Sequence, residues 1–194
     1  MYRFIETIKL KDGIFYNLTY HQNRLSRTSL KYSLPNYNIA QWLQAQSFPL
    51  EGLVKTRFLY DKKGVEIQFH PYEIKKIESL KLVEDNSIDY TYKRTNRSTL
   101  KALFEKREDC DDILIVKDGW VTDSYYANVI LSDGDQWFTP HQPLLEGTKR
   151  QQLINLGVLH TMPIGVKDIA RFQRVQLINA MIDIEDQLVI SSIQ

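Results

Sequence analysis

The sequence of 194 residues predicts an α+β fold of two domains. Short apolar runs separated by glycine turns occur in both halves and are typical of strands, and helical spacing of apolar residues appears between them. A polar stretch at 84–87 separates the halves. These observations place a small N-terminal α/β domain at 1–86 and a larger, β-rich, barrel-like domain at 87–194.

The first half combines strand patterns with two helical segments. The expected strands are 2–9, 14–16, 53–60, 65–70 and 80–83. The Asp12-Gly13 pair predicts a tight hairpin turn between the first two of them. From Asn17 the apolar spacing becomes helical, which predicts a helix that ends near Pro35, and a shorter helix is expected over 39–46.

Strand patterns follow one another quickly in the second half, with glycine turns at 117–119 and 132–134. The expected strands are 113–116, 120–122, 127–131, 136–139, 158–164 and 175–178. The expected helices are 96–106, 147–156 and a short polar one at 167–171. This density of strands favours a curved or barrel-like sheet with packed helices.

The charge pattern argues against nucleic acid or an anionic membrane as a partner. The 25 Lys and Arg nearly balance the 24 Asp and Glu, and no block of like charge stands out. The first ten residues include Arg3, Glu6 and Lys9, which excludes the apolar core of a signal peptide, so a cytoplasmic protein is expected. The single cysteine, Cys110, is interpreted as a surface thiol because acidic residues surround it.

The sequence contains no hydrolase elbow, Walker loop or dinucleotide-binding glycine pattern. The four histidines, His21, His70, His141 and His160, have no short ligand-like spacing, so no metal site is predicted. A small-molecule partner is the better expectation. The chain does offer an amine, an acid and phosphate donors, the three kinds of group that pyridoxal phosphate requires.

Four short runs of residues, taken in their order and spacing, are more specific than any single residue. They are 92–97, with Lys93; 112–123, with a glycine turn before Val121-Thr122-Asp123; 126–129, with Asn128; and 145–150, with Gly147-Thr148. Together they resemble the class IV aminotransferase family, which holds branched-chain and D-amino-acid aminotransferases and aminodeoxychorismate lyase. The segments 4–8, 12–13 and 21–25 also resemble the N-terminal half of that family.

The resemblance implies a catalytic lysine and an acid that serve pyridoxal 5′-phosphate. Lys93 matches the lysine that forms a Schiff base with the cofactor and moves the α-proton. Asp123 matches the acid that pairs with the pyridine nitrogen, although the family usually has the longer glutamate there. The competing interpretations are a solvated lysine and a turn carboxylate.

The resemblance also implies a set of residues around the cofactor phosphate. Arg24 matches the phosphate-binding arginine, and Gly147, Thr148 and Lys149 match a phosphate loop at a helix N-terminus. Asn128 matches the asparagine that orders the acid. Asn179 stands where an asparagine recurs near the phosphate or the substrate carboxylate. A snorkelling helix arginine and a plain helix cap are the alternatives for Arg24 and Thr148.

Three residues are candidates for contact with the substrate. Arg57 lies on an apolar strand, where an inward guanidinium requires an anionic partner such as a substrate carboxylate, although a strand-edge surface charge is equally compatible. Tyr92 and Tyr126 are expected to line the pocket, while core packing is the alternative for both. Glu6 and Thr7 match the family's first strand and carry no assigned role.

The resemblance implies a homodimeric enzyme with the cofactor between the two domains. A 4-amino-4-deoxychorismate lyase, which eliminates pyruvate to give 4-aminobenzoate for folate biosynthesis, is favoured slightly over a branched-chain or D-amino-acid aminotransferase. Aspartate at position 123 keeps a third hypothesis open, a family member that binds the cofactor without turnover. An unrelated ligand-binding α+β domain would bind no cofactor.

Overall fold

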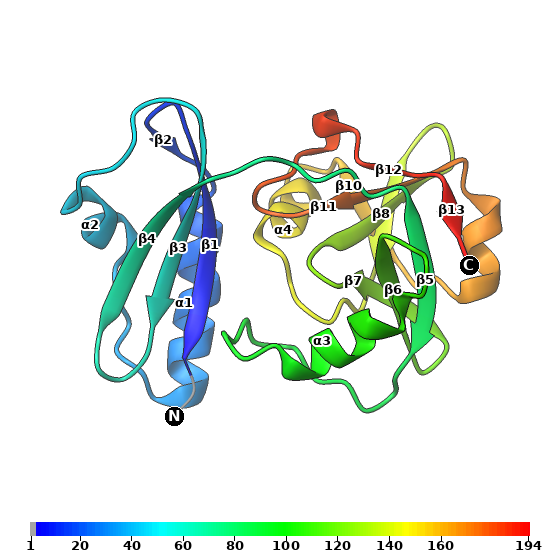
Figure 1. Ribbon diagram of the computed structural model, residues 1–194, viewed down its shortest axis with the longest axis horizontal. Coiled ribbons are helices and arrows are strands. Elements are labelled where there is room, and N and C mark those ends of the chain that lie inside the picture. Colours follow the sequence, from blue (N-terminus) through cyan, green and yellow to red (C-terminus); the bar gives the residue numbers. More distant parts are fainter. Residues whose placement is uncertain (1–2) are drawn as a thin grey trace. The chain divides into compact units, whose positions relative to one another are not determined.

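The computed structural model describes residues 3–194, which divide into two compact units (Figure 1). The first unit holds the chain up to Ile74 together with Tyr92–Asn96, and the second holds Lys75–Thr91 and Arg97–Gln194. The chain therefore crosses from one unit to the other after Ile74, Thr91 and Asn96, whereas the sequence analysis divides it once, after residue 86. Tyr2, which the sequence assigns to the first strand, lies outside the described residues.

A four-stranded antiparallel sheet with the strand order β2-β1-β3-β4 forms the first unit. Its elements are β1 (Phe4–Lys11), β2 (Ile14–Phe15), α1 (Leu18–Tyr32), α2 (Ile39–Gln44), β3 (Leu53–Tyr60) and β4 (Val65–Pro71). The turn between β1 and β2 has Asp12 at φ 48° and Gly13 at φ 78°, the left-handed pair that tight hairpins use. The predicted hairpin is confirmed.

The core of the first unit lies between α1, α2 and one face of the sheet. Alternate residues of the strands, Phe4 and Ile8 on β1 and Phe58 and Tyr60 on β3, are fully buried there against Leu25 of α1. Burying each such side chain stabilises the fold by about 1.5–3 kcal/mol. The same alternation puts the odd-numbered residues of β1 and β3 on the opposite face.

The segment Tyr92–Asn96 pairs with the beginning of β1. The backbone N–H of Ile5 donates to the carbonyl of Lys93 at 3.0 Å, the N–H of Thr95 donates to the carbonyl of Arg3 at 2.9 Å, and Phe4 and Arg94 form an antiparallel bridge. These bonds fix Lys93 beside β1. The sequence alone assigns this lysine to the start of the second half.

A nine-stranded mixed sheet forms the second unit, with the strand order β10-β9-β8-β7-β6-β5-β13; in addition, β11 pairs with β8, and β12 pairs with β11. Its strands are β5 (Ser79–Glu84), β6 (Asp112–Lys117), β7 (Trp120–Ser124), β8 (Asn128–Ser132), β9 (Trp137–Pro140), β10 (Leu159–Met162), β11 (Arg174–Ile178), β12 (Val189–Ile190) and β13 (Ser192–Ile193). Its helices are α3 (Ser98–Phe104), α4 (Thr148–Asn155) and the 3₁₀ turns η1 (Glu105–Arg107), η2 (Val166–Arg171) and η3 (Ile184–Asp186). The strand-rich α+β architecture agrees with the predicted fold class.

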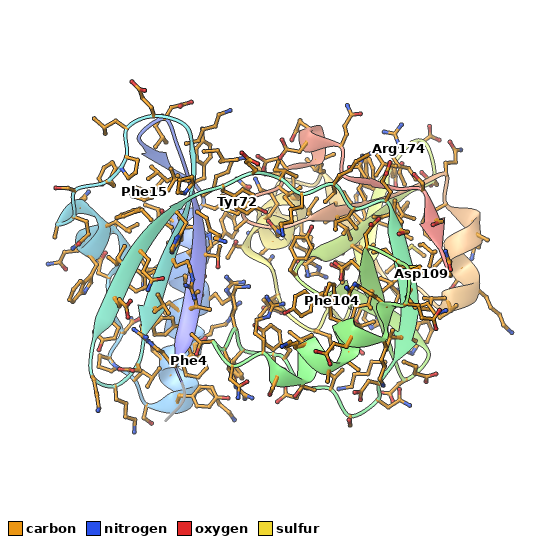
Figure 2. The ribbon with its side chains drawn as sticks, viewed as in Figure 1. Phe4, Phe15, Tyr72, Phe104, Asp109 and Arg174 are labelled. Atoms are coloured by element: carbon orange, nitrogen blue, oxygen red, sulfur yellow. The ribbon has the colours of Figure 1, made fainter. Side chains whose placement is uncertain are left out.

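Helix α3 covers part of this sheet. Leu100 and Leu103 of α3 are buried against Ile113 and Ile115 of β6. Phe104, labelled in Figure 2, lies at the end of the helix. Its ring packs on that of Tyr125 with the centroids 4.5 Å apart. This packing anchors the polypeptide that follows Asn96 to the second unit.

Local details depart from the sequence-based expectations in two places. Cys110, interpreted as a surface thiol, is 4% exposed because the η1 turn folds it against the sheet. Strands β12 and β13 were not predicted, since two-residue strands carry too little periodicity to be recognised. Within residues 3–194 no helix is long and apolar enough to cross a membrane.

Candidate active site

A buried cluster of one acid and two basic side chains joins β1 to α1 in the first unit. Glu6 faces the helix, and Arg24 donates from Nε to its Oε1 at 3.0 Å and from Nη2 to its Oε2 at 2.6 Å. Nδ1 of His21 lies 2.6 Å from the same Oε2. His21 and Arg24 are three residues apart in α1, so they share the helix face that covers the sheet.

The electrostatics of this cluster favour an ionised Glu6 and an uncharged His21. Burial raises the pKa of Glu6, but the charge of Arg24 and the hydrogen bond with His21 outweigh it and hold the pKa at about 2. Burial lowers the pKa of His21, although the bond to Glu6 opposes this. With His21 neutral, the charges of Glu6 and Arg24 cancel within the cluster.

Lys93 belongs to the same unit and is partly exposed. Its positive charge contributes to lowering the pKa of His21, so its amine is within electrostatic reach of the cluster. Its neighbour Tyr92 packs edge-on against Tyr32 of α1, with ring centroids 5.2 Å apart, and joins the apolar core of this unit. The structure thus gives Tyr92 a packing contact.

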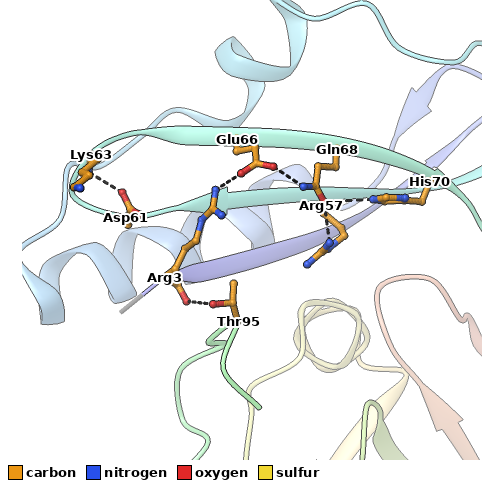
Figure 3. Close-up of polar contacts among 8 residues, drawn as sticks. All are labelled: Arg3, Arg57, Asp61, Lys63, Glu66, Gln68, His70 and Thr95. Atoms are coloured by element: carbon orange, nitrogen blue, oxygen red, sulfur yellow. Dashed lines mark hydrogen bonds and ion pairs between the residues drawn. The ribbon is translucent and has the colours of Figure 1, made fainter. Parts of the chain in front are cut away.

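Arg57 lies on the face of the first sheet that is turned away from α1. It is partly buried and donates from Nη1 to Oε1 of Gln68 on β4 at 2.8 Å (Figure 3). Gln68 in turn bonds to Glu66, which pairs with Arg3. In residues 3–194 no carboxylate lies within ion-pair distance of Arg57, so its guanidinium is held by a neutral amide.

The second unit contains a buried carboxylate with fixed hydrogen-bond donors. Asp123 on β7 pairs directly with Asn128 on β8, and its Oδ1 accepts from Asn128 Nδ2 at 2.7 Å. Its Oδ2 accepts from the backbone N–H of Leu145 at 2.9 Å. Burial raises the pKa of Asp123 to about 6, despite these bonds and the charge of Arg150.

Helix α4 begins beside this acid. A Cβ on Gly147 would stand 1.9 Å from Oδ1 of Asn128, so only glycine fits at the position before the helix. Thr148, the first residue of α4, is buried. Arg150 is buried too, and it donates to the carbonyl of Pro140 at 2.8 Å. The backbone N–H groups of the first turn of a helix are natural donors for a phosphate.

Two predicted cofactor residues of the second unit have partners inside the protein. The Lys149 amine forms an ion pair with Asp183 and donates to Gln152 Oε1 at 3.0 Å. The Asn179 carboxamide oxygen accepts from the N–H of Met181 at 2.8 Å, and its nitrogen lies 3.5 Å from the carbonyl of Tyr126. Among the predicted residues of this unit, the structure therefore brings Asp123, Asn128 and Gly147 together, and it places Asn179 beside Tyr126.

The sequence analysis assigned no role to another buried acid, Asp112 at the start of β6. Its Oδ1 accepts from the N–H groups of Ile113 and Tyr125, while its Oδ2 is buried and accepts no hydrogen bond from residues 3–194. Burial raises its pKa to about 6. A carboxylate that directly precedes an all-apolar strand, as in residues 112–116, is the signal that could have drawn attention to it. Within residues 3–194 no group of three or more His, Cys, Asp and Glu side chains is arranged to hold a metal ion.

The sequence matches a known family over most of its length. The pattern of the family described as Amino-transferase class IV matches residues 65–185. A Haemophilus influenzae protein, described only as uncharacterized, is 33% identical over 186 residues, which are 93% of this chain and 98% of that protein. The chain belongs to the class IV aminotransferase family. As a member of this family it is a pyridoxal-phosphate-dependent enzyme.

Solved structures of other family members share its fold. A candidate 4-amino-4-deoxychorismate lyase of Haemophilus somnus 129PT is 34% identical, with a TM-score of 0.87 over 93% of this chain and 97% of that one. A candidate amino-acid aminotransferase of Mesorhizobium loti is 19% identical, with a TM-score of 0.80 over the whole of both chains. The pyridoxal-phosphate-bound form of a hypothetical Mycobacterium tuberculosis aminotransferase has a TM-score of 0.79 at 17% identity, over 99% of this chain and 81% of that one. At these lower identities the likeness shows the fold alone.

The residues of this class IV aminotransferase family member fit the groups of pyridoxal phosphate by type. A buried acid whose pKa is raised to about 6 suits a pyridine nitrogen, because the two can share a proton. A glycine at position 147 lets Asn128, which holds the acid, approach the backbone directly before the α4 N-terminus. Lys93, which is partly exposed, has an amine of the type that a Schiff base requires. Each unit therefore contains groups suited to one part of the cofactor.

Proposed function

We propose that this enzyme is a 4-amino-4-deoxychorismate lyase, which eliminates pyruvate from its substrate to give 4-aminobenzoate. The observation that carries the proposal is the likeness to the Haemophilus somnus protein, at 34% identity over nearly the full length of both chains. An identity of 34% supports a similar function as well as a similar fold. Arg57, a partly buried cation with only an amide partner, supports a substrate that carries a carboxylate.

Lys93 is proposed to bind the cofactor covalently and to move the proton. When bound, pyridoxal phosphate withdraws electrons from the carbon that bears the substrate's amino group. The Lys93 amine then takes the proton from that carbon, the enolpyruvyl oxygen leaves, and pyruvate forms when the leaving group gains a proton. The net change is loss of pyruvate and formation of an aromatic ring, which needs no external oxidant.

Asp123 is proposed to hold a proton on the cofactor's ring nitrogen. Its two oxygens are fixed by Asn128 and by the N–H of Leu145, so the carboxylate is oriented before the cofactor arrives. Aspartate is one methylene shorter than the family's usual glutamate. The direct bond from Leu145 holds the loop before α4 against the acid.

Arg24 and the start of α4 are proposed to bind the cofactor phosphate. Glu6 fixes the Arg24 guanidinium through Nε and Nη2, which orients the planar group. Gly147, Thr148 and the backbone N–H of Lys149 supply the first turn of the helix. The Lys149 amine is assigned no phosphate contact, because Asp183 and Gln152 hold it.

The remaining predicted residues are proposed to act on the substrate side. Arg57 binds a substrate carboxylate, and Tyr126 and Asn179, joined through the Tyr126 carbonyl, line the pocket. Tyr92, whose ring packs on Tyr32 of the first unit, is also proposed to contact the substrate. An amino-acid aminotransferase is the second candidate, because Arg57 suits the carboxylate of an amino acid equally well. Homodimerisation, cytoplasmic location and a role in folate biosynthesis are part of the proposal.

The first test determines whether Lys93 forms a covalent bond with the cofactor. Purified protein is incubated with pyridoxal 5′-phosphate, reduced with borohydride and weighed intact by mass spectrometry, beside Lys93→Ala and Lys101→Ala. Lys101 lies exposed on α3 and serves as the control. We expect the covalent adduct in the wild type and in Lys101→Ala but not in Lys93→Ala. An adduct of equal yield in Lys93→Ala would refute the assignment of Lys93.

The second test determines which reaction the enzyme catalyses. The holoenzyme is given aminodeoxychorismate, and 4-aminobenzoate and pyruvate are measured, while parallel mixtures of branched-chain or D-amino acids with keto acids are assayed for amino transfer. Equal amounts of 4-aminobenzoate and pyruvate support the lyase. Amino transfer without 4-aminobenzoate contradicts it in favour of an aminotransferase, and no turnover in any mixture favours a family member that only binds the cofactor.

A further inference from the structure

The sheet face of the first unit that is turned away from α1 carries basic side chains in neighbouring rows. The strand register puts Lys9 of β1, Lys55 of β3 and His70 of β4 side by side in one row. The next row along β3 contains Arg57, flanked by Gln68. These residues share one face because side chains alternate along each strand.

Lys55 and Arg57 on this face have no carboxylate partner among residues 3–194. Directly opposed residues of antiparallel strands have Cβ atoms about 4.5–5.5 Å apart, and like charges in such positions destabilise a sheet. Within residues 3–194 no carboxylate lies in ion-pair distance of Lys55 or Arg57. Glu66 lies on the same face but pairs with Arg3 (Figure 3). An anion bound between Lys55 and Arg57 would offset the repulsion between these two like charges on one face of the sheet.

Aromatic rings flank the lysines of the row. The Lys55 amine lies 5.5 Å from the ring centre of Tyr72, and the Lys9 amine lies 5.8 Å from the ring centre of Tyr16. Such contacts hold an ammonium group in place without neutralising its charge. Lys9 is 8% exposed, so part of this positive charge is removed from water and acts more strongly on a nearby anion.

The spacing of the two rows matches a molecule with two carboxylates. Lys55 and Arg57 are two residues apart on β3, which separates their Cα atoms by about 6.4–6.8 Å. A dicarboxylate with its groups in a meta relation on a six-membered ring has a comparable span. Gln68 holds one end of the Arg57 guanidinium, and its Oε1 also lies 3.4 Å from His70 Nε2, so the rows are linked.

We propose that Lys55, with Lys9 and His70 beside it, forms a second carboxylate subsite next to Arg57, so that the enzyme selects substrates that carry two carboxylates. This inference rests on the proposed function in one respect, that Arg57 receives the first substrate carboxylate. Aminodeoxychorismate has two carboxylates, on the ring and on the enolpyruvyl group, whereas a branched-chain amino acid has one. A dicarboxylic amino acid such as glutamate would meet the same requirement.

The test uses the holoenzyme and two probes that cannot react, benzene-1,3-dicarboxylate and benzoate, with binding measured by calorimetry. The variants are Lys55→Met, Arg57→Met and, as the matched control, Lys62→Met, which removes the same charge from the exposed turn between β3 and β4. Far-ultraviolet circular dichroism and the Tm of each variant verify the fold. Lys55→Gln repeats the measurement with a polar side chain.

We expect the wild type and Lys62→Met to bind the dicarboxylate at least about tenfold more tightly than benzoate, which is the effect of one additional ion pair in a partly desolvated place. Lys55→Met should lose this preference and keep its affinity for benzoate, whereas Arg57→Met should weaken both probes. For a reacting dicarboxylate, Lys55→Met should raise KM about tenfold and leave kcat unchanged. Added salt should reduce the preference.

Equal binding of the two probes by the wild type would overturn the inference, as would a Lys55→Met variant that keeps the preference shown by Lys62→Met. Because the probes do not react, this result is independent of the reaction catalysed. An enzyme that makes no 4-aminobenzoate but retains the Lys55-dependent preference contradicts the lyase proposal alone. An enzyme that makes 4-aminobenzoate without that preference contradicts the second subsite alone.

Discussion

Gly147 lies so close to Asn128 that a Cβ on the glycine would stand 1.9 Å from the amide oxygen. Asn128 has little freedom to withdraw, because its Nδ2 donates to Asp123 at 2.7 Å and to the carbonyl of Leu145 at 3.0 Å. The backbone of Gly147 has an ordinary φ of −66°, so the requirement for glycine comes from this contact. The first residue before α4 and the acid on β7 are thereby coupled.

Replacing Gly147 by alanine should displace Asn128 and disturb Asp123. We expect Gly147→Ala to destabilise the apoprotein by about 1–3 kcal/mol, as overpacking does, and to weaken cofactor binding at least tenfold. Urea unfolding and titration with pyridoxal phosphate measure the two effects. Gly165→Ala is the control, because its Cβ would meet Asp168 at a less severe 3.3 Å. Equal behaviour of the two variants would contradict the coupling.

Replacing Glu6 by glutamine should leave Arg24 buried without its counter-charge. Loss of one partner of a buried pair costs about 3–5 kcal/mol, so a large fall in the free energy of unfolding is expected at pH 7. Glu66→Gln, which removes a carboxylate from an exposed pair with Arg3, should cost far less. Chemical denaturation of both variants compares the buried with the exposed pair.

The same carboxylate predicts how acid affects the first unit. The pKa of Glu6 is held at about 2 in the folded protein, below the 4.5 of an ordinary glutamate. The unfolded chain therefore binds a proton first, and the stabilisation is present above about pH 4.5 and lost as the pH falls toward 2. Glu6→Gln should flatten this part of the stability profile. A profile as steep as that of the wild type would refute the prediction.

Asp112 should make stability depend on pH in the opposite direction to Glu6. Its pKa is raised from 3.8 to about 6, so the folded protein binds the proton more tightly, and the free energy of unfolding falls as the pH rises from about 4 to about 6. Asp112→Asn keeps the oxygen that accepts from Ile113 and Tyr125 but removes the buried charge. We expect it to be more stable than the wild type at pH 7.5 by about 1–3 kcal/mol.

The neighbouring Asp111 provides a control of opposite sign. It is exposed and accepts from the N–H groups of Glu78 and Ser79, which lower its pKa. Asp111→Asn should therefore be less stable than the wild type at pH 7.5. Thermal unfolding of both variants from pH 4 to pH 8 measures the effects, and a loss of stability in Asp112→Asn at pH 7.5 would show that its charge is not costly.

Asp123→Asn should separate cofactor binding from turnover. An amide can still accept from Leu145 but carries no charge to hold a proton on the ring nitrogen, so we expect kcat to fall at least about 10²-fold while the Lys93 adduct still forms. Asp123→Glu, which restores the family's usual residue, should lose much less. Turnover and borohydride-trapped mass distinguish the two effects, and an Asp123→Asn enzyme as fast as the wild type would remove Asp123 from the mechanism.

Local patterns in the sequence determined the secondary structure of most of the chain. The Asp12-Gly13 turn fixes the first hairpin, because only a pair of residues with positive φ closes it with the correct twist. Strand β3 was predicted with its observed bounds, since strong alternation is a local property. The order and spacing of the motifs around Lys93, Asp123 and Gly147 identified the family.

Tertiary structure alone decided which of these residues meet. The segment of Lys93 joins the first unit through a hydrogen bond from Ile5, far away in the sequence, and no local pattern records such a bond. Glu6, His21 and Arg24 become one cluster only when α1 packs on β1, and that packing desolvates all three at once. Desolvation raises the pKa of Asp112 and Asp123, whereas at Glu6 the charge of Arg24 and the bond with His21 outweigh it. Desolvation and charge pairing are both properties of the packed fold, which is why the sequence named the chemical groups but not their charges.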